Sequence, residues 1–279
     1  MKNIVVLKVV IMALLLNGCS SVTKQTAAID EDLLFYSYNP DDILREIDEK
    51  WEALGYAEKP TKYIAISFDD GPAGNARAVG MRTQDVLDVL AEKRVKATFF
   101  LIGQNVRTYP DAVQAILDTG HEVGNHSDDG AGLGARAGGS LDGIDVQTIR
   151  SKLDAASAAI KDVAGKSPFF FRAPNVDYGI NLATVCKTLG MPLIGANVWS
   201  NDWDASRTAD ECMVSVINSA SDGGIINFHE PNTSGNRTLP VLADIIEALR
   251  SDGYWILSVG QLAALKGKEL EAGVRYDSL

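Results

Sequence analysis

Two adjacent carboxylates stand at the end of an apolar run near residue 70. The run, residues 63–68, is rich in β-branched and aromatic side chains, and Asp69 and Asp70 separate it from a Gly-Pro turn. Neighbouring carboxylates repel each other, and a cation or a shared proton relieves the repulsion. The motif therefore predicts a metal ion or an arginine beside these acids. An ordinary solvated turn is the alternative, because turns favour Asp and Gly for local reasons.

Ionisable side chains also follow other apolar stretches farther along the chain. These side chains are His126, Arg172, Asp202 and His229. If the stretches are parallel strands of a βα barrel, their carboxyl ends meet on one face, where the active sites of such barrels lie. Each residue alone could be a structural ion pair or a hydrogen-bonded loop residue, so only their joint occurrence predicts a catalytic site.

The residue types favour metal-assisted hydrolysis of an ester or an amide. Asp70 and His126 combine a carboxylate with an imidazole, a donor pair that suits Zn²⁺ or a similar borderline metal ion. Such an ion acidifies a bound water and polarises a carbonyl group. Asp69 is then free to act as the general base, with Arg172 keeping it ionised and oriented.

A second pair of residues supplies the general acid. His229 can donate a proton to a leaving group if Asp202 keeps its imidazole charged. The remaining histidine, His121, begins an apolar stretch, and we expect it to be a packed, hydrogen-bonded structural residue.

Alternating strand-like and helix-like stretches must position these side chains. Repeated βα units predict a parallel sheet covered by helices, and seven strands in this rhythm favour a distorted (β/α) barrel in the α/β class over an open sheet. No dinucleotide-binding fingerprint follows the first strand, which argues against a Rossmann fold. The expected strands are residues 63–68, 97–102, 122–125, 169–172, 193–197, 224–229 and 254–259. The expected helices are residues 83–93, 110–118, 146–163, 180–189, 209–219 and 239–250.

The N-terminus has the pattern of a targeting segment. Its apolar run, residues 4–16, is too short to span a bilayer as a mature helix. The run leads into a Leu-Asn-Gly-Cys sequence that resembles the end of a bacterial lipoprotein signal. We therefore expect a signal peptide over residues 1–18 and a lipid anchor on Cys19, which place the protein on an outer membrane, facing the periplasm or the exterior. A plain secretory signal and a secreted protein are the alternative.

The remaining sequence features limit the domain organisation and the possible partners. We expect a tether and an amphipathic helix (residues 41–54) within residues 19–59, and the main domain over residues 60–279. The formal net charge of −11 argues against nucleic acid or an anionic membrane surface as a partner. Cys186 and Cys212 could pair in an oxidising compartment or remain two buried thiols. We expect a monomer.

The order of the motifs resembles one enzyme family. Residues 68–72 (FDDGP), 120–127 (GHEVGNHS), 172–174 (RAP), 202–203 (DW) and His229 are similar to the motifs of the polysaccharide deacetylases, the NodB homology domain of carbohydrate esterase family four. The resemblance covers about residues 60–265. It implies a distorted (β/α) barrel, a divalent metal ion (Zn²⁺ first, with Co²⁺ or Ni²⁺ as alternatives), and removal of N- or O-linked acetyl groups from glycans such as chitin, peptidoglycan or xylan.

The resemblance also implies roles for individual residues. It gives the roles described above to Asp69, Asp70, His126, Arg172, Asp202 and His229. It adds Trp203 as a wall of the acetyl pocket. The backbone N–H of Asn175 would donate a hydrogen bond to the oxyanion of the reaction.

Two positions depart from the family pattern. The metal-binding motif usually has a second histidine where this chain has Gly130, so the remaining ligand is open between water, Asp128 and Asp129. Asn227 stands where the family often has a leucine that lines the methyl pocket. This second change bears on the choice of substrate more than on the type of reaction.

Two classes of function follow from these observations. The first is a metal-dependent hydrolase that removes acetyl groups from acetylated polysaccharide or oligosaccharide. Chains that contain N-acetylglucosamine, such as chitin or peptidoglycan, are favoured, and O-deacetylation of acetylated xylan is the alternative substrate class. The second class is a carbohydrate-binding lipoprotein that has lost catalysis, which Gly130 motivates. The retained acid, base and supporting residues favour the enzyme.

Overall fold

The structure of the protein is a computed structural model. It describes residues 32–34, 36–56, 58–74, 82–129, 144–176, 178–230 and 237–279. These residues belong to one compact unit, Asp32–Leu279. The expected signal peptide, the anchor at Cys19, the first part of the tether and Gly130 lie outside the described residues.

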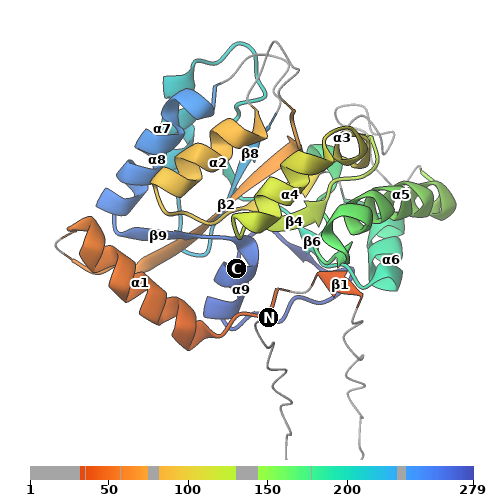
Figure 1. The fold of residues 1–279 in the computed structure, drawn as a ribbon, viewed down its shortest axis with the longest axis horizontal. Helices are drawn as coiled ribbons and strands as arrows, with labels where there is room; N and C mark the ends of the chain where they lie inside the picture. Colours follow the sequence, from red (N-terminus) through yellow and green to blue (C-terminus); the bar gives the residue numbers. More distant parts are fainter. Residues whose placement is uncertain are drawn as a thin grey trace, which may run out of the picture. The chain divides into compact units, whose positions relative to one another are not determined.

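Parallel strands form the centre of the unit (Figure 1). They are β2 (Lys62–Gly71), β3 (Thr98–Leu101), β4 (Glu122–Asn125), β7 (Val198–Trp199), β8 (Ile225–His229) and β9 (Tyr254–Leu257). β2 is central, because it pairs with β3 and β8 near its carboxyl end and with β9 near its amino end. β4 flanks β3, and β7 flanks β8.

Single bridges complete the ring of strands. Phe171 pairs in parallel with Asn125 of β4 and with Leu193 of β6 (Leu193–Ile194). β6 and β7 lie in the same short segment, and β7 pairs with β8. This pairing closes the ring. Each expected strand segment is thus found in parallel pairing, and the prediction of an α/β fold with a distorted barrel is confirmed.

Two of the expected strands differ in extent from the prediction. The strand expected at residues 169–172 is reduced to the bridges of Phe171, and the strand expected at residues 193–197 is divided into β6 and β7. The guanidinium group of Arg172 explains the division. Its Nε donates to the carbonyl oxygen of Ile194 (3.1 Å) and its Nη2 to that of Gly195 (2.7 Å), so these carbonyls bind a side chain instead of a neighbouring strand.

Helices surround the strands. Those that the sequence predicts are α2 (Thr83–Glu92), α4 (Pro110–Asp118), α5 (Val146–Ala164), α6 (Ile180–Leu189), α7 (Ala209–Ser219) and α8 (Leu239–Ser251). Neighbours contact each other in the order α7, α8, α2, α4, α5 and α6 (Figure 1). The sequence reading missed α3 (Gly103–Thr108) and α9 (Val259–Leu265). α9 replaces the end of the last expected strand because Ser258 caps it, its hydroxyl accepting from the N–H of Gln261 (3.3 Å).

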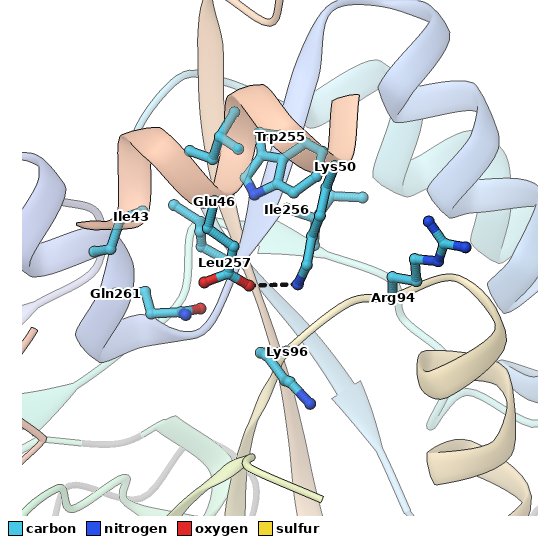
Figure 2. Close-up of a pocket in the computed structure, with 10 residues that line it drawn as sticks. Ile43, Glu46, Lys50, Arg94, Lys96, Trp255, Ile256, Leu257 and Gln261 are labelled. Atoms are coloured by element: carbon cyan, nitrogen blue, oxygen red, sulfur yellow. Dashed lines mark hydrogen bonds and ion pairs between the residues drawn. The ribbon is translucent and has the colours of Figure 1, made fainter. Parts of the chain in front are cut away.

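The amphipathic helix before the barrel is α1 (Pro40–Leu54). Its apolar face buries Ile43, Ile47 and Trp51, and the ring of Trp51 lies 5.7 Å from that of Trp255 in β9. A pocket lies between α1 and β9, where Figure 2 shows the ion pair of Glu46 and Lys50 on α1. None of the predicted catalytic residues lines this pocket.

Part of the expected tether is packed against the main unit. β1 (Leu33–Leu34) pairs with β5 (Ser167–Pro168), and the hydroxyl of Tyr36 accepts a hydrogen bond from the N–H of Val123 (2.8 Å). These residues, which we expected to belong to the tether, are therefore part of the compact unit, which begins at Asp32. Apolar and aromatic side chains explain the difference. Their burial stabilises the folded unit, whereas the polar side chains of a tether would gain no such stabilisation.

Two further features bear on the predictions. Cys186 and Cys212 are both buried and unbonded. Among the described residues, no helix has the length and apolar character needed to cross a membrane.

Candidate active site

Asp69 lies inside the barrel because side chains alternate along β2. Ile64, Ile66 and Phe68 belong to the core between the strands and the helices, whereas Ser67 and Asp69 face the other side. Asp69 is 2% exposed. A buried carboxylate must be paired, and this one is paired as the sequence predicts.

Arg172 is the partner of Asp69. Its Nη1 donates to Asp69 Oδ1 (2.8 Å) and to the hydroxyl oxygen of Ser67 (2.8 Å), and its other N–H groups bind the two backbone carbonyls described above. The guanidinium lies 4.1 Å from the centre of the Phe100 ring. The buried guanidinium is therefore hydrogen-bonded through Nε, Nη1 and Nη2, and the contact from Nη1 anchors one oxygen of the base.

Asp70 turns in a different direction from its neighbour. Its backbone has φ of 70°, in the left-handed region, and Asn105 of α3 donates to its carbonyl oxygen (2.8 Å). The Asp70 side chain is 38% exposed, and its Oδ1 lies 3.4 Å from Nε2 of His126. The same nitrogen lies 3.9 Å from Asp69 Oδ2. The two aspartates thus share a neighbour while occupying distinct environments.

His126 is oriented through its other ring nitrogen. Nδ1 lies 2.8 Å from the carbonyl oxygen of Arg172, to which it donates, so Nε2 is the nitrogen that faces the two aspartates. The turn that presents this ring is fixed by Asn125, which accepts from the N–H of Ser127 (2.7 Å) and donates to the carbonyl oxygen of Leu153 (2.9 Å). The local fold therefore aims Nε2 of His126 at Asp70.

This pair of donors fits a divalent metal ion. A histidine nitrogen with its second nitrogen bound to a carbonyl, beside a half-exposed carboxylate, is the donor chemistry of zinc-type sites. Asp70 and His126 are thus the residues that would hold the ion. These are two protein donors; among the described residues there is no group of three or more His, Cys, Asp or Glu side chains that could hold a metal ion.

The two acids considered as further ligands are engaged elsewhere. Asp128 binds Nη2 of Arg107 (2.7 Å), and Asp129 binds Nζ of Lys152 (2.8 Å). These ion pairs argue against a role for either acid at the metal. Water is the alternative that agrees with these contacts, while Gly130 itself lies outside the described residues.

His229 and Asp202 form the second predicted pair. Asp202 Oδ1 lies 2.7 Å from His229 Nδ1, and Asp202 Oδ2 accepts from the backbone N–H of His229 (2.9 Å) and from the hydroxyl of Thr238. Asp202 is fully buried. With Nδ1 bound to the carboxylate, Nε2 is the nitrogen of His229 that remains for a substrate.

The charges set opposite protonation states for Asp69 and His229. Burial alone would raise the pKa of Asp69, but the charge of Arg172, followed by those of His126 and His229, outweighs burial and holds the pKa below its usual value. Burial alone would lower the pKa of His229, yet Asp202 outweighs it and raises the pKa to about 9. At neutral pH the site therefore contains an ionised acceptor and a protonated donor.

Comparison with known proteins decides the family. A family model described as polysaccharide deacetylase matches residues 56–194. A peptidoglycan-N-acetylglucosamine deacetylase of Bacillus cereus is 30% identical over 77% of this chain and 96% of its own. The chain belongs to the polysaccharide deacetylase family.

Other relatives of this polysaccharide deacetylase-family protein are named for different activities. A bifunctional xylanase/deacetylase of Pseudobutyrivibrio xylanivorans is 36% identical over 74% of this chain, which spans 31% of that larger protein. A solved family 4 acetyl xylan esterase from Clostridium thermocellum, in complex with a cobalt ion, is 32% identical, with a TM-score of 0.68 over 78% of this chain and 99% of its own.

The two predicted substrate contacts lie on loops that follow strand ends. Trp203 is 57% exposed. Asn175 is exposed in the turn Pro174–Val176 after Arg172, with φ of 59°. A ligand can reach both residues, and their roles remain predictions.

The sequence analysis did not single out Asn105 and Thr238, which support the site, and it assigned Asn227 to the lining of the acetyl pocket. Besides Asn105 and Thr238, the structure brings Asn227 to the base: its Nδ2 donates to Asp69 Oδ2 (2.8 Å), and the residue is 1% exposed. A signal for Asn227 was present, because it lies two residues before His229 and strand side chains two apart share a face. Asn105 and Thr238 gave no such signal, since Asn105 lies in α3 and Thr238 directly precedes α8, and the sequence does not reveal where these segments pack.

Proposed function

We propose that the protein is a metal-dependent hydrolase that removes acetyl groups from acetylated polysaccharide or oligosaccharide. Chains that contain N-acetylglucosamine, such as peptidoglycan or chitin, are the favoured substrates. The single observation that carries the proposal is the grouping at the carboxyl ends of β2 and β8. There an ionised, buried Asp69 and a half-exposed Asp70 face His126, with protonated His229 on the paired strand.

The residues proposed as base and acid lie on adjacent strands. Asp69 of β2 pairs in register with His229 of β8. Adjacent parallel strands lie about 4.8 Å apart, which leaves room for the reacting acetyl group beyond the two strand ends. The general base and the general acid can therefore serve the same acetyl group, the base at the attacking water and the acid at the leaving atom.

Asp69 would accept a proton from the attacking water. Its carboxylate stays ionised because Arg172 lowers its pKa. A carboxyl with a lowered pKa is a weak base, so it needs a water that is already acidified. The metal ion, when held by Asp70 and His126, supplies that acidity and polarises the acetyl carbonyl.

His229 would protonate the leaving group. The bond from the acetyl carbon to the sugar nitrogen or oxygen breaks, and that atom takes the proton from Nε2 of His229. A deprotonated amine (R–NH⁻) or an alkoxide is a poor leaving group, so this proton is needed for both substrate classes. Asp202 keeps the imidazole charged and fixes the ring through Nδ1.

Acetate release tests the proposal. The full chain, loaded in turn with Zn²⁺, Co²⁺ or Ni²⁺, is incubated with N-acetylated chitooligosaccharides, peptidoglycan fragments and acetylated xylan. Release from the first two supports the favoured substrates. Release from xylan alone supports the ester-specific alternative, which the similarity to an acetyl xylan esterase motivates. No release from any substrate with any ion would favour the carbohydrate-binding alternative.

A further inference from the structure

Asn227 contacts Oδ2 of Asp69, whereas Arg172 contacts Oδ1. On β8 it pairs in register with Ser67, two residues before the pair formed by Asp69 and His229. Its buried side chain donates from Nδ2 to Asp69 Oδ2 (2.8 Å). This contact differs from what the sequence suggested, namely a change in the lining of the acetyl pocket.

Arg172 alone does not fix the plane of the Asp69 carboxylate. Nη1 reaches the carboxylate at Oδ1, whereas the hydrogen bond of Nη2 goes to the carbonyl oxygen of Gly195. A single contact leaves rotation about the Cβ–Cγ bond free, since this torsion is broad for aspartate. The contact of Asn227 with Oδ2 supplies the second point that fixes the plane.

We propose that Asn227 is a positioning residue for the general base. By holding Oδ2, it keeps a remaining lone pair of that oxygen on the side of His126 and Asp70, where the attacking water must lie. A carboxylate oxygen accepts more than one hydrogen bond, so the amide does not block the proton transfer. The amide is also neutral and holds the carboxylate without adding a charge. This inference rests on the proposed function.

The first test removes the donor while keeping the shape. Asn227→Leu replaces the amide by an apolar side chain of similar size and branching. We expect kcat to fall about 10-fold to 100-fold, since small misplacement of a reacting group costs this much. KM and the affinity for Zn²⁺, measured by titration with a competing chelator, should change less than about twofold. A rise in KM with unchanged kcat would overturn the inference, because it would indicate a role in substrate binding.

A matched control comes from the neighbouring segment. Asn197 also bonds β8, accepting from the N–H of Ile225 (2.9 Å), but it lies at the opposite end of the strand from the site. Asn197→Leu should therefore leave kcat unchanged when the protein is folded. An equal loss of kcat in both variants would show a general effect on the barrel and overturn the inference. If Asn227→Leu does not fold, Asn227→Ala removes the same donor, and the same loss confined to kcat is expected.

A double-mutant cycle asks whether Asn227 acts through the base. In an Asp69→Asn background, the loss caused by Asn227→Leu should disappear from the residual rate, because there is no base left to position. The same fold loss in both backgrounds would overturn the inference. Failure of the proposed function is distinguishable, since the unaltered protein would then release no acetate.

Discussion

Two neighbouring aspartates with different environments are the basis of the site at the scale of single residues. The left-handed backbone of Asp70 separates its side chain from that of Asp69, which the alternation of β2 directs to Arg172. One carboxylate is thereby buried and paired, and the other is half-exposed beside His126. The same residue type can then serve as a base in one position and as a ligand in the next.

Exchanging each aspartate for asparagine should separate these roles. Asp69→Asn removes the proton acceptor, and we expect kcat to fall about 10²-fold to 10⁴-fold with metal affinity nearly unchanged. Asp70→Asn removes a charged donor, and metal affinity should fall at least about 10-fold. Kinetics at saturating metal and chelator titrations of both variants check the prediction. Near-normal turnover by Asp69→Asn would show that the base is assigned wrongly.

The pH dependence should report the acid. The pKa of His229 is raised to about 9 by Asp202, so the imidazole is protonated below that pH and kcat/KM should fall as pH rises through about 9. The ion pair of His229 and Asp202 also stabilises the folded protein. This stabilisation is complete below about pH 6.5 and is lost as pH rises through about 9.

Asp202→Asn provides the comparison for this pH profile. It removes the charge that holds the proton, so the alkaline fall of kcat/KM should move toward the usual histidine pKa of about 6.5. Thermal unfolding followed over the same pH range separates loss of the acid from loss of the fold. A profile that is flat between pH 8 and pH 10, for a folded protein, would contradict the role of His229.

At the scale of elements, the sequence predicted the strands that carry the site better than the contacts between them. Apolar runs that end in polar residues located β2, β4 and β8, because burial on both faces dictates their composition. The sequence did not predict the division of the fifth expected strand. That division depends on which backbone carbonyls the side chain of Arg172 binds. The contact of Asn227 with Asp69 depends likewise on the register between β2 and β8, which only the folded sheet defines.

The loop after β2 is held by a buried acid that the sequence reading did not single out. Glu230 is fully buried, and its Oε2 accepts from the hydroxyl of Thr83 (2.9 Å), which in turn accepts from the N–H of Ala73 (2.8 Å). Its Oε1 has no hydrogen-bond partner among the described residues. Burial raises the pKa of Glu230 to about 8. The side chain is thus a neutral acid at neutral pH.

Replacing this acid by its amide should change how stability depends on pH. The unfolded chain ionises at the usual value of about 4.5, while folded Glu230 stays protonated to about 8, so wild-type stability falls as pH rises between these values. Glu230→Gln lacks this titration and should gain on the order of 1–4 kcal/mol over the wild type between pH 5 and pH 8. Denaturant unfolding measures the difference. Glu52→Gln, on the exposed face of α1, is the control and should show none.

At the scale of the whole molecule, the segment before the barrel is part of the folded unit. Leu33–Leu34, Tyr36 and α1 pack on the strands, although their polar surroundings suggested a tether. Short strands and single aromatic contacts leave little pattern in a sequence, because a two-residue strand has no measurable alternation. The compact unit therefore begins at Asp32.

The anchor itself is the last prediction at this scale. An acidic chain is repelled by an anionic membrane surface, so stable attachment would have to come from lipid on Cys19 and not from charge. We expect the full chain in the membrane fraction, resistant to high salt, and Cys19→Ser in the soluble fraction. Cys212→Ala is the matched control, since this buried thiol lies outside the signal and its loss should leave the protein at the membrane. Mass spectrometry of the N-terminal peptide reads the modification directly. An unmodified Cys19, or membrane attachment that survives Cys19→Ser, would leave secretion or another means of attachment as the explanation.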